Sequence, residues 1–187
     1  TNISSVHSPV RGRHPLLKED LLKFIKFVGG EKEAVKKAKE HFESIGITVV
    51  SLDNTINSEV GKLLSTTYYA MNITVHREFH RLCEEIGADF SQAVSLFNAT
   101  STIDIGHKIP RPLMFPSKIK GHCLIPNIDI LKHDVKSELL DFVLKTNEEV
   151  DEKKMEHIKE KIKEIDLKYR KGIEQNFFKK IKENASV

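Results

Sequence analysis

The sequence has few cysteines, little net charge and no long apolar run. Its two cysteines, Cys83 and Cys123, exclude a disulfide scaffold and favour a reducing, cytoplasmic setting. No run of about 18 apolar residues occurs, so no membrane-spanning helix is expected, and no signal peptide is visible. The formal net charge is +3, from 30 basic and 27 acidic residues, and without clustering this excludes a nucleic-acid-binding surface.

Common nucleotide- and metal-binding motifs are also absent. The sequence contains no G-x-G-x-x-G, P-loop or G-x-S-x-G motif. Gly29 and Gly30 follow a predicted strand and are interpreted as a tight turn. His76 and His80 lie four residues apart on a predicted helix, but no acidic or cysteine ligand at a suitable spacing completes a zinc site. We therefore expect no metal.

Residues 1–54 predict a small α/β unit. A short strand ends at Pro9, a second covers 24–28, and a third covers 47–52. Apolar residues at helical spacing over 31–45, followed by Gly46, predict a helix between the second and third strands. This is a βαβ unit, which implies parallel pairing. A sheet of two or three strands with one helix is too small to form a stable domain. The unit is therefore interpreted as the end of a larger α/β domain.

The rest of the chain is predicted to be mainly helical. Apolar residues recur every three or four positions from Ile56 to Ile86, which predicts one helix of about 30 residues, near 45 Å long. Asp53 or Asn54 would cap it and Gly87 would end it. A second helix is expected over 90–98 with Asp89 as its cap.

The following segment, 101–127, contains four prolines and is predicted to be a functional loop. A helix should follow from Asp129 or Val135 to Val150. Over 151–184, Met155, Ile158 and Ile162 belong to a coiled-coil-like apolar seam that Gly172 interrupts. This C-terminal helix would dock on its own domain or on a second copy, and the alternative is a dedicated partner-binding helix.

The two cysteines lie in different settings. Cys83 lies on the long helix and is interpreted as a small buried hydrophobic residue. Cys123 lies in the loop after Gly121 and His122, near lysines 118 and 120. Cationic neighbours favour the nucleophilic thiolate, so a reactive role and an inert thiol both stay open from the residues alone.

Four segments in order resemble the UDP-glucose/GDP-mannose dehydrogenase family: "SPVRGRHP", "KFVGG", "SEVGKLLSTTYY" at the start of the long helix, and "KGHCLIPN". The resemblance covers about residues 5–150. It implies a helical 6-phosphogluconate-dehydrogenase-C-terminal-like domain over 55–150, which forms a homodimer through the long helix, 55–86. Residues 1–54 would be the remnant of a dinucleotide-binding domain whose glycine motif lies upstream, and 151–187 would be a C-terminal amphipathic helix.

The resemblance also implies a chemistry. A sugar C6 alcohol on a nucleotide-sugar substrate would be oxidised to an acid with NAD, for polysaccharide biosynthesis, and activity would require the N-terminal domain. Cys123 matches the family nucleophile, which forms a thiohemiacetal and then a thioester. Lys62 matches a helix lysine that would stabilise the oxyanion. His14, Lys120, Gly121 and His122 are predicted to contact the substrate.

Several positions depart from the family pattern. Thr66 replaces an asparagine. Asn127 occupies the place of an aspartate, unless a one-residue insertion moves Asp129 there. Val10 and His14 fall where some members carry glutamates, and His14 would act as a general base or lie in the turn.

Lys120 replaces a second glycine before the His-Cys pair, and the helix over 151–184 stands in place of the family's C-terminal nucleotide-binding domain. The leading hypothesis is a dehydrogenase. The alternatives are a non-catalytic helical dimerisation or scaffold module, and an oxidoreductase that performs one hydride transfer without hydrolysis.

Overall fold

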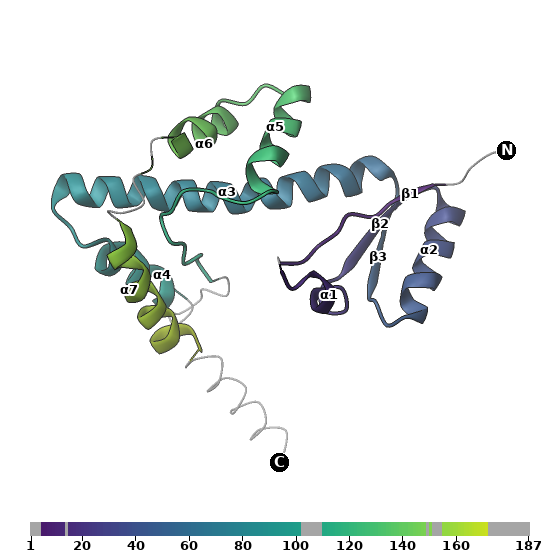
Figure 1. Ribbon diagram of the computed structural model, residues 1–187, viewed down its shortest axis with the longest axis horizontal. Coiled ribbons are helices and arrows are strands. Elements are labelled where there is room, and N and C mark those ends of the chain that lie inside the picture. Colours follow the sequence, from purple (N-terminus) through teal and green to yellow (C-terminus); the bar gives the residue numbers. More distant parts are fainter. Residues whose placement is uncertain (1–4, 14, 102–109, 149, 151–154, 172–187) are drawn as a thin grey trace, which may run out of the picture. The chain divides into compact units, whose positions relative to one another are not determined.

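The computed structural model describes residues 5–13, 15–101, 110–148, 150 and 155–171 (Figure 1). The chain divides into two compact units, residues 1–67 and 68–187, and the division falls inside the long helix α3 (Thr55–Ile86). The fold is mainly α-helical with one three-stranded sheet, which confirms the predicted fold class. The predicted domain boundaries after residues 54 and 150 stay predictions.

The first unit contains the sheet. Its strands β1 (Val6–His7), β2 (Lys26–Gly30) and β3 (Val49–Leu52) follow the order β1-β2-β3. Strand β1 pairs antiparallel with β2, whereas β2 and β3 pair in parallel. Helix α2 (Lys32–Ser44) connects the two parallel strands, which confirms the βαβ unit. Short helix α1 (Leu17–Asp20) lies in the connection before β2. Val28, Val35 and Val49 form the buried core.

The paired glycines belong to β2 and do not form the predicted turn. The strand starts at Lys26 and continues through Gly30. A Cβ added to Gly29 would lie 2.2 Å from the Asn54 carbonyl oxygen and 2.7 Å from Ser58 Oγ. The glycine is therefore needed because the start of α3 approaches the strand backbone closely, and strand pairing continues where a turn was expected.

Helix α3 agrees with the sequence prediction at both ends. The Asn54 side chain accepts a hydrogen bond from the Asn57 backbone N–H at 2.8 Å, so it is the N-terminal cap. Gly87 ends the helix with a φ of +83°, a conformation that glycine adopts without strain. No helix within the described ranges combines the length and apolar character that crossing a bilayer requires.

In the described part of the second unit, six helical segments follow α3. Their bounds are η1 (Ser91–Leu96), α4 (Phe97–Thr100), α5 (Leu124–Asp134), α6 (Glu138–Glu148), α7 (Glu156–Asp166) and η3 (Leu167–Lys171). The predicted cap at Asp89 is confirmed, because its carboxylate accepts a hydrogen bond from Gln92 N–H at 3.1 Å. One core cluster joins α3, α5 and α6 through residues such as Ile73, Ile128 and Val143.

The predicted boundary between loop and helix was wrong. Helix α5 begins at Leu124, although the loop was expected to continue to residue 127. Pro126 was taken as a loop residue, but a proline in the first turn of a helix loses no hydrogen bond because its N–H would have no intrahelical partner. Of the two predicted starts for the helix that ends near Val150, Asp129 is wrong, because Val135 has extended φ and ψ of −135° and 144°. The start at Val135 agrees with α6 to within three residues.

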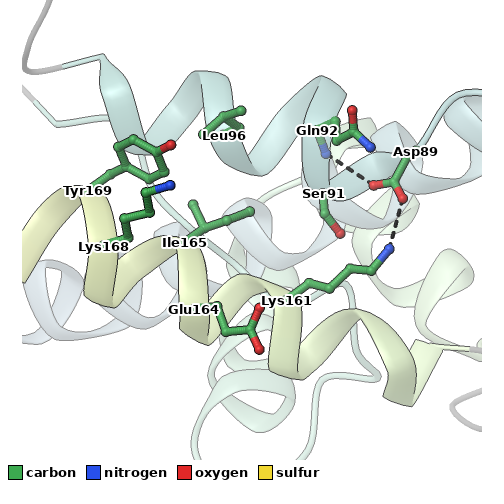
Figure 2. Close-up of a pocket in the computed structure, with 9 residues that line it drawn as sticks. All are labelled: Asp89, Ser91, Gln92, Leu96, Lys161, Glu164, Ile165, Lys168 and Tyr169. Carbon is green, nitrogen blue, oxygen red and sulfur yellow. Dashed lines mark hydrogen bonds and ion pairs between the residues drawn. The ribbon is translucent and has the colours of Figure 1, made fainter.

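The C-terminal helix α7 docks on its own unit. Ile158 and Ile162 pack with Cys83 and Phe90 in a second core cluster. Lys161 on α7 forms a 2.9 Å ion pair with Asp89, at one side of a cavity of about 320 Å³ between η1 and α7–η3 (Figure 2). None of the predicted site residues that the structure describes lines this cavity. The part of the predicted helix over 172–184 lies outside the described residues.

Candidate active site

Cys123 is an exposed thiol immediately before α5. It occupies the N-cap position, and its side chain makes no capping hydrogen bond. Its backbone carbonyl accepts the Asn127 N–H at 3.1 Å, so the residue belongs to the first turn of the helix. The positive end of the helix dipole lies at this terminus.

Cys83 has the opposite environment. It is buried in the second core cluster with Phe90, Ile158 and Ile162, which confirms the prediction of a small buried hydrophobic residue. Burial, together with the negative charge of Asp89, raises the pKa of the Cys83 thiol. Of the two cysteines, Cys123 is therefore the one that a substrate can reach.

The geometry of α5 places Asn127, rather than Asp129, next to Cys123. Asn127 lies one helical turn beyond Cys123 and is half-buried, whereas Asp129 is exposed. At about 100° per residue, Asp129 lies about 200° around the helix from Asn127. An amide therefore occupies the position four residues after the thiol.

Three exposed residues precede the thiol. Gly121 has a φ of +100°, which a residue with a side chain adopts only with strain. Lys120 and His122 flank it, and all three are exposed. The glycine thus turns the chain so that His122 and Cys123 enter α5 from the surface.

Buried Asn147 on α6 anchors the segment that leads to Cys123. Its side-chain oxygen accepts the Ile119 backbone N–H at 2.7 Å, and its amide nitrogen donates to the Ile119 carbonyl at 3.2 Å. The side chain therefore satisfies both backbone groups of a buried residue, as a neighbouring strand would. The role of Asn147 could not be predicted from the sequence, because an asparagine late in a helix carries no specific signal.

Arg77 on α3 supports the same anchor. Its Nη1 donates to Asn147 at 2.9 Å, and its Nη2 donates to the hydroxyls of Thr74 and Thr146, each at 3.1 Å. The guanidinium is buried, and burial lowers its pKa. A signal was present in the sequence, since Arg77 lies four residues after buried Ile73 and thus on the buried side of the helix.

His76 and His80 both contact protein groups. The ring of His76 lies between two carbonyl oxygens, Asn72 at 2.7 Å and Pro112 at 3.0 Å. His80 packs edge-on against Phe90. In the part of the chain that the structure describes, no three His, Cys, Asp or Glu side chains converge to hold a metal ion.

Lys62 and Thr66 lie in the first unit. Lys62 lines a second cavity of about 320 Å³. The Thr66 hydroxyl donates to the Leu63 carbonyl at 2.8 Å. His14 lies outside the described residues. Asn127 is linked to Cys123 by the backbone hydrogen bond of the first helical turn. A catalytic site that contains Cys123, Asn127, Lys62 and Thr66 stays a prediction.

Arg11 lines the same cavity as Lys62 and was not among the predicted site residues. Its guanidinium lies over two aromatic rings, 5.7 Å from the centroid of Phe24 and 5.1 Å from that of Phe27. The basic turn "SPVRGRHP" was noticed in the sequence, but which of its arginines faces a cavity depends on the path of the loop.

Comparison with known proteins identifies the family. The profile of the UDP-glucose/GDP-mannose dehydrogenase family, central domain, matches residues 56–152, just over half of the chain. The UDP-N-acetyl-D-mannosamine dehydrogenases of Methanococcus vannielii and Methanocaldococcus jannaschii are 26% and 27% identical to it over 119 residues. Each match covers 63% of this chain and 26% of the relative, so the chain spans about a quarter of the relatives' length.

Solved structures show the same fold. The UDP-D-ManNAc dehydrogenase of Pyrococcus horikoshii superposes with a TM-score of 0.64 at 22% identity, covering 76% of this chain and 33% of its own. An NDP-N-acetyl-D-galactosaminuronic acid dehydrogenase of Methanosarcina mazei superposes equally well, at 0.64 and 19% identity, covering 76% and 32%. Because the family profile spans the long helix and the Cys123 segment, the chain belongs to the UDP-glucose/GDP-mannose dehydrogenase family.

Proposed function

We propose that this chain supplies the covalent-catalysis part of an NAD-dependent nucleotide-sugar dehydrogenase, with Cys123 as the nucleophile. The observation that carries the proposal is the exposed thiol at the start of α5, within the segment that matches the family profile. Cys83 cannot take this role because it is buried. A UDP-linked N-acetylated sugar is the substrate class that the names of the relatives favour.

The proposed reaction proceeds in four steps. The alcohol would give a hydride from C6 to bound NAD and a proton to solvent, which leaves an aldehyde. The Cys123 thiolate then adds to the aldehyde carbon, and the oxygen takes up a proton to give a thiohemiacetal. This adduct would give a hydride to a second NAD and its hydroxyl proton to solvent, which leaves a thioester. Water adds to the thioester carbon, the carbon–sulfur bond breaks, and the acid leaves with the thiolate restored and a proton released.

Three further side chains have proposed roles. Lys62 would stabilise the oxyanion that forms when sulfur adds to the aldehyde. Asn127, one turn after Cys123, can orient a water molecule through its amide, but an amide cannot accept the water's proton. Hydrolysis is therefore the step that this chain should perform most slowly. The Thr66 hydroxyl donates a hydrogen bond to its own helix, and its oxygen would accept a hydrogen bond from the substrate.

NAD is the hydride acceptor that the family resemblance implies, and hydride acceptance is the chemistry it supplies when bound. The described residues do not fit a dinucleotide cradle. Gly29 packs against Asn54 and Ser58, which leaves no room for a pyrophosphate at the end of β2. We assign no hydride-transfer step to this chain, and we propose that residues outside it hold NAD.

The loop before Cys123 would bind the substrate. Lys120, Gly121 and His122 are exposed beside the thiol, and we propose that they contact the nucleotide sugar, together with His14. We also propose a homodimer through α3, because this helix exposes several large apolar side chains.

The test uses the full-length protein with NAD and a panel of nucleotide sugars, and measures NADH and sugar products. The parent protein should release two NADH per sugar and an acid. Cys123→Ser should release no acid, because an alcohol side chain forms the covalent adduct far less readily. Cys83→Ala is the matched control and should still make acid. Acid formation by Cys123→Ser at the parental rate would sink the proposal.

A second candidate is a non-catalytic dimerisation or scaffold module. The observation in its favour is the amide of Asn127 in place of a carboxylate beside the thiol. Under this alternative, no nucleotide sugar would yield NADH in the experiment above, while the dimer would persist. A protein that releases one NADH per sugar and accumulates aldehyde would instead support oxidation without hydrolysis.

A further inference from the structure

The second unit contains a cavity between α3 and α6 that the proposed dehydrogenase reaction does not use. It has a volume of about 250 Å³, just below the range for drug-sized ligands, so a ligand there would be small. Arg77, His80 and Glu84 on α3 line it, together with Phe142 on α6 and Met155 at the start of α7. None of the described residues with a proposed role in the reaction is among its lining residues.

Arg77 is a buried cation without a counter-charge among the described residues. It is 7% exposed, and its three hydrogen bonds all go to neutral oxygens, those of Asn147, Thr74 and Thr146. Its Nε is buried and has no hydrogen-bond partner in the described part of the chain. Burial lowers the pKa of Arg77, and no neighbouring negative charge offsets this effect. A buried charge is normally paired, so this guanidinium favours an anion beside it.

His80 is a second buried group that lacks a hydrogen bond at the same cavity. It is 5% exposed, and its Nδ1 has no hydrogen-bond partner within the described ranges. The nearest Glu84 oxygen lies 3.5 Å from Nδ1, outside the ordinary hydrogen-bond range. This nitrogen can donate to a ligand oxygen when it carries the proton. Buried polar groups without partners are uncommon, so two of them at one cavity indicate a ligand that contacts both.

The other charged residues at the cavity favour a ligand with a single negative charge. Arg81 donates to both oxygens of Glu78, at 3.0 and 2.7 Å, and to Glu85 at 2.8 Å, so its own charge is already engaged. The exposed carboxylate of Glu84 lies at the same wall as Arg77. Glu84 would repel a ligand with two negative charges, whereas one carboxylate matches the single charge of Arg77.

We propose that this cavity binds a small monocarboxylic acid, with Arg77 as the counter-ion of its carboxylate. The carboxylate would accept hydrogen bonds from Arg77 and His80, and a bond between two charged groups is stronger than a neutral one. Phe142 and Met155 would contact the apolar body of the ligand. The site requires neither Cys123 nor NAD, so it can fail while the dehydrogenase reaction stands, and the reverse.

The experiment titrates the full chain with benzoate, acetate and sulfate at constant pH and ionic strength. NMR follows the Arg77 Nε–H signal and the backbone amide of Thr146. We expect a saturable shift with benzoate, weaker binding of acetate because it lacks an apolar body, and weaker binding of sulfate because it carries two charges. No saturable shift with benzoate, or tighter binding of sulfate than of benzoate, overturns the proposal.

A charge-removing variant tests the role of Arg77. Arg77→Gln should weaken benzoate binding about tenfold or more, because it removes a charged hydrogen bond. Binding is then followed through the Thr146 amide. Lys145→Gln is the matched control, since Lys145 is an exposed cation on α6 that does not line the cavity. Parental affinity in Arg77→Gln, or an equal loss in Lys145→Gln, contradicts the proposed site.

Two surface variants keep the test valid if Arg77→Gln does not fold. Phe142 is 43% exposed, so Phe142→Ala should fold, weaken benzoate binding about fivefold and leave acetate binding unchanged. Glu84→Gln removes the repelling carboxylate and should tighten the binding of sulfate. Unchanged benzoate affinity in Phe142→Ala contradicts the proposed location, and unchanged sulfate affinity in Glu84→Gln contradicts the preference for a single charge.

Discussion

Asp20 organises the loop that carries Arg11. Its carboxylate is fully buried and accepts hydrogen bonds from the Arg13 side chain and from the Arg13 backbone N–H at 2.8 Å. Gly12 allows this approach, because a Cβ there would lie 3.1 Å from Asp20 Cβ. The hydrogen bonds from Arg13 lower the pKa of Asp20 to about 2. At the scale of the residue, one carboxylate therefore determines the path of this loop.

This pair predicts a pH-dependent stability. The folded pKa of Asp20 is depressed, so its contribution is complete above its ordinary value of 3.8 and is lost as the pH falls through about 2. Asp20→Asn should lower the urea midpoint at pH near 7, and the difference from the parent should shrink toward pH about 2. Glu19→Gln, a change at an exposed neighbour, is the control. A difference that is constant over this window contradicts the explanation.

At the scale of elements, two helices present the thiol. Helix α5 starts just after Cys123 and buries Ile128, while α6 supplies Asn147 to the Ile119 backbone. The exposed residues between Ile119 and α5 are thus attached at both ends to the same core cluster. An exposed nucleophile can be positioned in this way without being buried itself.

Loss of the Asn147 anchor should be costly. Asn147→Leu leaves both backbone groups of Ile119 buried without partners and removes one acceptor of Arg77. We expect the free energy of unfolding to fall by about 1–3 kcal/mol. Chemical denaturation measures this loss, and amide hydrogen exchange at Ile119 should accelerate locally.

Thr146→Val is the matched control for Asn147→Leu. It removes another acceptor of Arg77 but leaves Ile119 untouched. It should therefore leave exchange at Ile119 unchanged relative to global stability. Equal acceleration in both variants would mean that Arg77, and not the Asn147 side chain, holds the segment.

At the scale of the whole molecule, the long helix presents an apolar face that is exposed among the residues that the structure describes. Within the second unit, exposed apolar side chains recur on α3 at steps that keep them on one side of the helix. These are Tyr68, Val75, Phe79, Leu82 and Ile86. Ile86 is 79% exposed, which is unusual for a large aliphatic residue, so a second copy of the helix is the proposed cover.

Disruption of this face should give a monomer. Phe79 is 42% exposed, so it is not a core residue. Phe79→Glu would therefore place a charge in the proposed interface without disturbing the core. Sedimentation or light scattering should show a mass close to the chain's 21.4 kDa for the variant and twice that value for the parent. Leu139→Glu, a similar change on α6, should remain dimeric. A parent that is already monomeric contradicts the proposed homodimer.

Helices and strands with regular apolar spacing could be predicted from the sequence, whereas the exact ends of some elements could not. The βαβ unit and α3 follow from apolar spacing and end signals, which depend on local chemistry. The start of α5 was missed because Pro126 marks a loop as often as a first helical turn. Gly29 was predicted to lie in a turn but lies in β2. The reason for a glycine there is the close approach of the Asn54 backbone, a tertiary contact that the local sequence does not show.

The sequence by itself determined the family and the long helix, since motif order and periodicity can be read along the chain. It also predicted Cys123 as the reactive cysteine, and that role stays a prediction. Only the tertiary structure decided which groups surround them. Asn147 and Arg77 come from distant helices to hold Ile119, and Arg11 meets Lys62 at a cavity across 51 positions of sequence. Burial and hydrogen-bond partners arise when the chain folds back on itself, so no local pattern encodes them.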